Sequence, residues 1–165
     1  MTVVLDYRVD ATVVETLETN VPVLTATAKQ VRHTLYNREN LQLNGATTPP
    51  VTKVAIFSKA MSGGAATIDL AALTGTNGAA VDGTGLKVQL FKIKAPAANS
   101  AAVTIAVGAS NGYDLSGSAF SLTLAPGQEM TLFGNDATPD IGSSDKELDM
   151  SGSGTDALEC VCVMG

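Results

Sequence analysis

Apolar and polar residues alternate along several short stretches of this chain, which is the pattern of strands that bury one face. Residues 120–124 read Phe-Ser-Leu-Thr-Leu, and residues 103–107 read Val-Thr-Ile-Ala-Val. Successive side chains of a strand point to opposite faces of a sheet, so each run has one apolar side. The same reasoning predicts strands at 51–59, 67–70, 86–93, 103–107, 120–124, 130–133 and 158–164. The pattern therefore predicts an all-β protein.

Two of these segments depart from simple alternation. Residues 158–164 are apolar on both faces except at Glu159, which predicts a central strand. In 86–93 the apolar residues change register between Leu90 and Phe91. A β-bulge produces such a change, and burial of both faces would also account for it.

Turn signals separate the strands. Pro126-Gly127 places proline second and glycine third in a four-residue turn, as a type II turn requires, and predicts a hairpin between the flanking strands. Asn111-Gly112 is the preferred pair for a two-residue hairpin turn. Residues 73–85 are rich in small and polar residues and predict a surface loop. Helix signals are few: 12–18 fits two helical turns or a strand, and 68–73 fits one helical turn.

The first 48 residues differ from the rest of the chain. They contain few glycines and a polar stretch at 29–44, and Thr48-Pro49-Pro50 then stiffens the junction. We therefore divide the chain into an N-terminal segment, 1–48, and a β-sandwich domain, 49–165. The segment supplies either the opening strands of the same sandwich or an extended arm that pairs with a neighbouring subunit. The first alternative is favoured, because most segments of a compact chain belong to its own core.

Composition and charge narrow the function. The 165 residues are 45% hydrophobic but only 4% aromatic, without tryptophan, so a core of aliphatic residues is expected. The net charge of −6 and the absence of a Lys/Arg cluster argue against nucleic acid as a direct partner. No run of about 18 apolar residues is present, so no membrane insertion is expected. Residues 1–10 lack the basic and apolar regions of a signal peptide, which predicts a protein kept in a cytosol or in a particle assembled there.

Few residues offer chemistry. Cys160 and Cys162 lie on one face of a predicted strand, and we interpret them as reduced, buried side chains. The only histidine, His33, lies far from them in sequence and is interpreted as a structural residue. There is no Gly-x-Ser-x-Gly motif for a nucleophile. We therefore predict that the chain is not an enzyme and has no catalytic, cofactor-binding or metal-binding residue.

A group of acidic residues leaves one alternative open. They lie in a Gly/Ser-containing loop over 135–149, where carboxylates are the oxygen ligands that calcium prefers. The residues are Asp136, Asp140, Asp145, Glu147 and Asp149. Their spacing fits no EF-hand, and acids in a solvated loop are common, so the sequence does not decide whether a calcium site exists.

Four segments carry a resemblance to a known group of proteins. They are 86–94 (LKVQLFKIK), 109–115 (ASNGYDL), 122–128 (LTLAPGQ) and 149–155 (DMSGSGT). From about residue 68 onward the chain resembles small β-sandwich structural proteins of tailed bacteriophages, which decorate or cement a capsid or form minor head proteins. The resemblance implies an antiparallel, jelly-roll-like sandwich and a homo-oligomer, often a trimer. It also implies that the partner is the major capsid protein or another virion protein. The expected location is the virion, which is assembled in the host cytoplasm. No interface residue can be transferred.

We therefore expect a virion structural protein that acts by protein–protein contact. The alternative is a carbohydrate- or receptor-binding module of a phage tail, although three tyrosines (Tyr7, Tyr36 and Tyr113) and four phenylalanines offer few platforms for sugars. A large exposed apolar patch would favour the first function. Aligned, exposed tyrosine or phenylalanine side chains would favour the second, and titratable groups gathered in a pocket would favour an enzyme.

Overall fold

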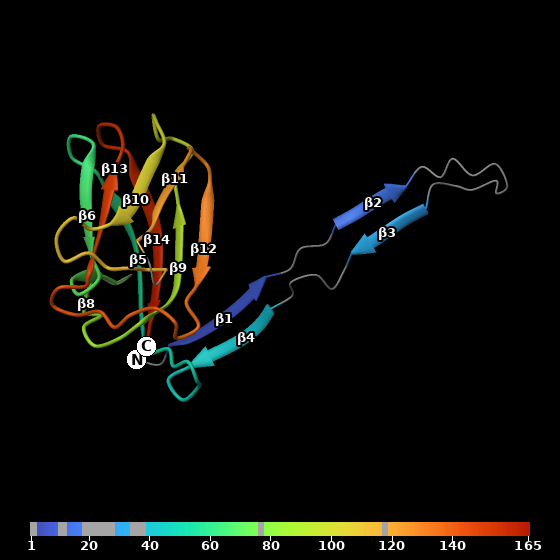
Figure 1. Ribbon diagram of the computed structural model, residues 1–165, viewed down its shortest axis with the longest axis horizontal. Coiled ribbons are helices and arrows are strands. Elements are labelled where there is room, and N and C mark those ends of the chain that lie inside the picture. Colours follow the sequence, from blue (N-terminus) through green and yellow to red (C-terminus); the bar gives the residue numbers. More distant parts are fainter. Residues whose placement is uncertain (1–2, 10–12, 18–28, 34–38, 76–77, 117–118) are drawn as a thin grey trace. The chain divides into compact units, whose positions relative to one another are not determined.

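The computed structural model describes the chain over residues 3–9, 13–17, 29–33, 39–75, 78–116 and 119–165, with side chains over 3–8, 41–75, 78–116 and 119–165. Every regular element within these ranges is a β-strand (Figure 1), which confirms the predicted all-β class. The strands are β1 (Val4–Val9), β2 (Val13–Leu17), β3 (Lys29–His33), β4 (Glu39–Asn44), β5 (Lys53–Ala60), β6 (Ala65–Asp69), β7 (Leu73–Thr74), β8 (Ala80–Val81), β9 (Val88–Lys94), β10 (Val103–Val107), β11 (Ser121–Leu124), β12 (Glu129–Phe133), β13 (Glu147–Ser151) and β14 (Ala157–Met164). No helix long and apolar enough to span a membrane occurs in these ranges.

Two four-stranded sheets form the larger part of the structure. One has the order β12-β9-β14-β5 and the other has the order β11-β10-β13-β6. Of these eight strands, the first pairs with the last (β5 with β14), the second with the seventh (β6 with β13), the third with the sixth (β9 with β12) and the fourth with the fifth (β10 with β11), all antiparallel. This nested pairing is that of a jelly roll, an antiparallel ribbon of strands wrapped into a two-sheet sandwich. The predicted jelly-roll-like sandwich is therefore confirmed.

The predicted hairpin at Pro126-Gly127 is wrong, although the turn itself forms. The amide of Gln128 donates to the carbonyl of Ala125 over 2.9 Å, and Gly127 has a positive φ of 86°. However, β11 before the turn pairs with β10, and β12 after it pairs with β9 in the other sheet. The turn carries the chain from one sheet to the other. Local turn chemistry fixes the direction of the chain but does not fix which strands become hydrogen-bonded neighbours.

Asn111-Gly112 does not close a two-residue hairpin either. Asn111 has the positive φ of 50° that such turns favour. Residues 108–120 nevertheless separate β10 from β11, and Gly112 forms an isolated bridge with Glu147. The amides of Lys146 and Glu147 both donate to the carbonyl of Asn111 over 2.8 Å. The turn therefore anchors the loop after β10 to the start of β13.

The remaining local predictions have mixed outcomes. Residues 13–17 form the strand β2, in place of the helical alternative for 12–18, whose two end residues lie outside the described ranges. Residues 69–72 form a single hydrogen-bonded turn, with the amide of Ala72 donating to the carbonyl of Asp69 over 3.0 Å. The predicted loop 73–85 contains the two-residue strands β7 and β8, which pair with each other. The loop's residues 76–77 lie outside the described ranges.

The space between the two four-stranded sheets is filled mainly by aliphatic side chains. Phe91 and Tyr113 are the largest fully buried residues of this core, which is otherwise built from leucine, isoleucine, valine, methionine, alanine and the two cysteines. The hydroxyl of Tyr113 donates to the carbonyl of Pro139 over 2.7 Å, so its one polar atom is satisfied. The core accordingly has the aliphatic character that the composition predicts.

Both departures from simple alternation have structural causes. β14 lies between β9 and β5, which confirms the predicted central strand. In β9, Leu90 pairs with Val163 and Val88 pairs with Met164, so Gln89 has no partner on β14. This is the predicted β-bulge, located one residue before the change of register in the sequence. The buried Gln89 side chain accepts a hydrogen bond from the amide of Asp136 over 2.9 Å.

The four N-terminal strands pair among themselves. β1 pairs with β4 and β2 pairs with β3, and neither two-stranded ladder is part of a four-stranded sheet. Residues 5–42 form one compact unit, and residues 1–4 together with 43–165 form the other. None of the described strands β1–β4 therefore belongs to either four-stranded sheet. Whether they pair with a neighbouring subunit stays a prediction.

Candidate functional site

The side of the β12-β9-β14-β5 sheet that points away from the core carries a regular arrangement of charged and apolar side chains. Antiparallel register aligns its outward side chains in rows across the four strands. The first row consists of Glu129, Lys94, Glu159 and Ser58. The second consists of Thr131, Lys92, Val161 and Ile56, and the third of Phe133, Leu90, Val163 and Val54. We call these three rows the outer face.

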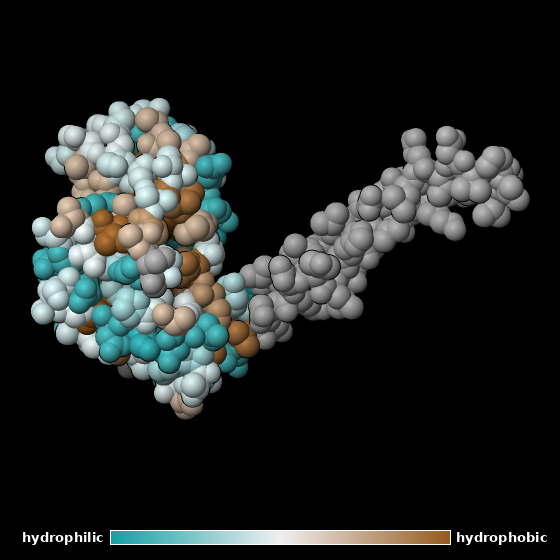
Figure 2. Space-filling model, viewed as in Figure 1, coloured by the Kyte–Doolittle hydropathy of each residue, from teal (hydrophilic) through white to brown (hydrophobic). Residues whose placement is uncertain are grey.

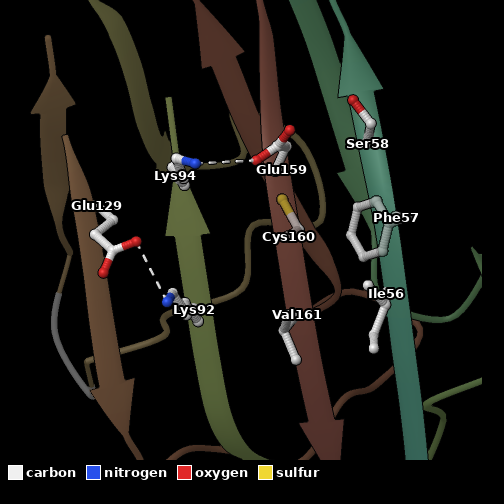
Figure 3. Close-up of a pocket in the computed structure, with 9 residues that line it drawn as sticks. All are labelled: Ile56, Phe57, Ser58, Lys92, Lys94, Glu129, Glu159, Cys160 and Val161. Carbon is white, nitrogen blue, oxygen red and sulfur yellow. Dashed lines mark ion pairs between the residues drawn. The ribbon is translucent and has the colours of Figure 1, made fainter. Parts of the chain in front are cut away.

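Opposite charges alternate across the outer face. The Lys94 ammonium lies 3.8 Å from a carboxylate oxygen of Glu159, and the Lys92 ammonium lies 3.3 Å from a carboxylate oxygen of Glu129 (Figure 3). All four side chains are between 42% and 56% exposed. Exposed pairs of this kind contribute little to stability, about 0–1 kcal/mol each. Their positions matter more for what the face can contact than for the fold.

An apolar area borders the charged rows. Ile56 is 47% exposed and, with Val4, is one of two large hydrophobic side chains exposed among the described residues. Its register partner Val161 is half-buried beside it. A shallow hollow of about 520 Å³ lies over this part of the sheet, lined by the paired charges and by Ile56 and Val161 (Figure 3). The hollow is open to solvent, and Phe57, Ser58 and Cys160 also line it.

The third row is largely covered. Leu90 and Val163 are 6% and 2% exposed but are not part of the core cluster between the sheets. Leu43 and Val51 share this property, and the amide of Thr52 next to them donates to the carbonyl of Met164 over 2.9 Å. Residues 43–52 therefore lie along the end of β14. Of the outer face, the first two rows remain open.

The other sheet presents small side chains to the outside. Thr104 and Thr123 lie side by side with their hydroxyl oxygens 2.8 Å apart. The hydroxyl of Thr67 donates to the Asp149 carboxylate over 2.8 Å, and the amide of Ala109 donates to its other oxygen over 2.8 Å. The surface carries three acids, Asp69, Glu147 and Asp149. Both carboxylate oxygens of Asp149 accept hydrogen bonds, and the Asp69 carboxylate pairs with the Lys146 ammonium over 2.8 Å.

The structure separates the acidic residues that raised the question of calcium. Among the residues with described side chains, no three histidine, cysteine, aspartate or glutamate side chains gather as a metal site. Asp136 pairs with Lys87, and Asp149 is held by Thr67 and Ala109. Asp145 accepts a hydrogen bond from the neighbouring Ser144. His33 ends β3, and its side chain lies outside the described ranges, so its predicted structural role stays a prediction.

The two cysteines are located as the sequence predicts. Both are free and buried, 2% exposed at Cys160 and 0% at Cys162, and both point into the core from β14. Burial raises the pKa of the Cys160 thiol to about 12, and it raises the pKa of Cys162 still further above the ordinary value. Neither is an activated thiol.

Comparison of the chain with known proteins gave no match to a family model, a curated protein or a solved structure. The fold and the outer face are therefore the features from which a function can be inferred. The residues of that face were not identified from the sequence. The sequence indicates which positions of each strand are polar. It does not indicate that Lys94 and Glu159 are neighbours, because they meet only through the pairing of β9 with β14.

Both thiols are expected to be unreactive in the folded protein. Reaction requires an accessible thiolate, and burial and the raised pKa values remove both access and ionisation. An aromatic disulfide reagent at pH 8 should modify both residues only after unfolding in urea. A Ser58→Cys variant is the matched control, because Ser58 is exposed on the same sheet and should react while folded. Rapid modification of Cys160 or Cys162 in native buffer would contradict the core assignment.

Asp156 is expected to make stability depend on pH. Its carboxylate accepts hydrogen bonds from the amides of Ser100 and Ala101 over 2.8 and 2.9 Å and from the Ser100 hydroxyl over 3.0 Å. The Ser100 amide is the largest cause that holds the pKa of Asp156 below its ordinary value. Because the pKa of Asp156 is lower in the folded than in the unfolded protein, its ionised carboxylate stabilises the fold at pH values above the ordinary aspartate pKa of about 3.9. This stabilisation is lost as the pH falls through the folded-state pKa.

The measurement is urea unfolding of the wild type and Asp156→Asn at pH 7, 5 and 3. The wild type should be the more stable protein at pH 7 and at pH 5. The difference between the two free energies of unfolding should shrink toward pH 3. A difference that is constant over this range would show that the ionised carboxylate of Asp156 is not what holds residues 100–101.

Proposed function

We propose that this chain is a structural protein of a virus particle, a capsid decoration or minor head protein that acts by contact with other protein. The observation that carries the proposal is the strand order of the sandwich, β12-β9-β14-β5 against β11-β10-β13-β6. Jelly rolls with two such sheets recur in viral capsid proteins. The resemblance of residues 86–94, 109–115, 122–128 and 149–155 to phage structural proteins supports the same function.

The chemistry of the described residues supports contact over catalysis. The hollow on the outer face is open and is lined by ion-paired charges, and both cysteines are buried with raised pKa values. Nucleophilic and acid–base catalysis need an accessible group with a tuned pKa in a closed site. The outer face instead offers charged side chains beside apolar ones, and in protein interfaces such polar groups occupy the rim around an apolar centre.

One expected sign of an interface is lacking. The exposed apolar patch that would favour a decoration protein does not occur among the described residues, where Val4 and Ile56 are the exposed large hydrophobic side chains. On the side of the sandwich shown in Figure 2, apolar residues appear in separate small groups between polar ones. The proposed contact is therefore mixed in character, with polar and charged groups contributing.

Jelly rolls also occur in lectins, which keeps a sugar-binding module of a phage tail as the alternative. Sugar recognition would favour aromatic side chains aligned on a surface. The described tyrosine and phenylalanine side chains are all buried or half-buried, and Tyr36 lies outside the described ranges. The described surface thus supplies no aromatic platform in support of this alternative.

Co-sedimentation with purified shells tests the proposed function. The full chain should pellet with empty phage heads in a saturable way, at a fixed ratio to the major capsid protein, and should stay in solution without them. A glycan array measures the alternative on the same protein. If the chain bound no shell but bound a glycan in a saturable way, the proposed structural function would be contradicted and the sugar-binding alternative would be supported.

A further inference from the structure

The charges of the outer face form a pattern that is complementary to itself. Within its first two rows, Lys94 on β9 lies directly opposite Glu159 on β14. Consider a second copy facing the first across a two-fold axis that runs parallel to the strands, between β9 and β14. This rotation exchanges the positions of the two central strands, so Lys94 of each copy would meet Glu159 of the other. A two-fold interface needs this kind of self-complementary patch.

The net charge supports a second copy as the occupant. The chain carries −6, so two copies repel each other over most of their surfaces. On the outer face, two lysines (Lys92 and Lys94) balance two glutamates (Glu129 and Glu159). A second molecule can approach this neutral area at a small electrostatic cost. A partner with an excess of one charge would gain no advantage from an alternating pattern.

The apolar side chains of the second row add to the contact. Under the same rotation, Ile56 on β5 would face Thr131 on β12 of the other copy, and Val161 would cover the aliphatic part of Lys92. Lysine side chains bury their methylene groups readily while the ammonium remains in contact with water. The 47% exposed Ile56 would thereby lose contact with water.

We propose that the outer face is a homodimer interface, in which two copies pack β12-β9-β14-β5 sheets against each other around a two-fold axis. This inference goes beyond the proposed function and requires no shell. The two open rows of the outer face contain four residues each, whereas a stable interface has about 20–30 residues on each side. The dimer should therefore be weak. The dimer should be detectable as the protein concentration approaches roughly 1 mM, the dissociation constant of a weak complex.

A charge exchange tests the dimer. Lys94→Glu leaves two acids in the central positions, and Glu159→Lys leaves two lysines, so each variant alone should dimerise about tenfold more weakly than the wild type or not at all. Mixed in equal amounts, the two variants place acids opposite lysines at both central contacts. The mixture should form a heterodimer, and the double variant should regain the homodimer.

The matched control is Asp145→Lys, which changes the net charge by the same amount as Glu159→Lys at an exposed loop residue away from the sheet. This control should dimerise at least as well as the wild type, and thermal unfolding should show that every variant is folded. Native mass spectrometry and sedimentation velocity report the mass of each sample.

A wild-type dimer with rescue in the mixed sample supports the interface. A wild-type trimer, a wild-type monomer at every concentration, or single variants that dimerise as the wild type does would each overturn it. Binding of shells is measured separately on the single variants. Loss of the dimer with retained shell binding would thus show that the proposed function holds and that this interface is not the surface that binds the shell.

Discussion

Replacement of Phe91 by alanine should lower the free energy of unfolding by about 3–5 kcal/mol. Phe91 is fully buried on β9 between the sheets, and its register partner on β14 is the buried Cys162. The substitution removes the largest apolar side chain of the core and leaves a cavity that surrounding strands cannot fill without moving. Since domains of this size are stable by about 5–15 kcal/mol, the loss is a large fraction of the total.

The control for Phe91→Ala is Lys92→Ala on the same strand. Lys92 points to the outer face and pairs with Glu129, so its replacement should cost no more than about 1 kcal/mol. Urea unfolding followed by circular dichroism measures both. Equal costs for the two substitutions would mean that β9 does not have Phe91 on its core side, and the bulge at Gln89 would then be misplaced.

Replacement of Gly112 by alanine should destabilise the protein by about 1–3 kcal/mol or more. A Cβ atom at this position would lie 2.3 Å from the carbonyl oxygen of Gly108 and 2.5 Å from a methyl carbon of Val107. The carbonyl belongs to the backbone at the end of β10, so it cannot move aside cheaply. The loop would have to shift away from Glu147, with which Gly112 forms its bridge.

Gly142→Ala is the matched control for Gly112→Ala. There a Cβ atom would meet only the Asp145 carboxylate at 3.6 Å, an ordinary contact, and the effect should stay within about 0.5 kcal/mol. Thermal or urea unfolding of both variants provides the comparison. If Gly112→Ala were as harmless as Gly142→Ala, the close approach of the 108–112 loop to itself would not exist in solution.

The sequence predicted those features of the fold that depend on neighbouring residues. Residues 158–164 are apolar on both faces because alternate side chains of β14 face the core, while on its other face Val163 is buried and Val161 is half-buried. The change of register after Leu90 reflects a bulge at Gln89, which is one of the two causes that the order of apolar residues indicated. Pro126-Gly127 likewise adopts its turn because proline and glycine prefer the required backbone angles.

Features that depend on distant pairing could not be predicted in the same way. The strands on the two sides of Pro126-Gly127 look like a hairpin, but β11 and β12 belong to different sheets because each completes a pair with an earlier strand. For the same reason the outer face was not foreseen, since Lys94 and Glu159 meet only through β9 and β14. For residues 1–48 the sequence left two alternatives, strands of the sandwich or an extended arm, and it did not indicate that β1 pairs with β4 and β2 with β3.

We propose that this protein works by contact with other protein, including its own copies. The most direct test of this proposal is the mass of the full chain in solution, measured by sedimentation over a wide range of concentrations, alone and with purified shells. We expect a mass that rises from 16.8 kDa toward that of a dimer, and transfer of the chain to the sedimenting shells. A mass that stays at 16.8 kDa at every concentration and with every shell would contradict the claim.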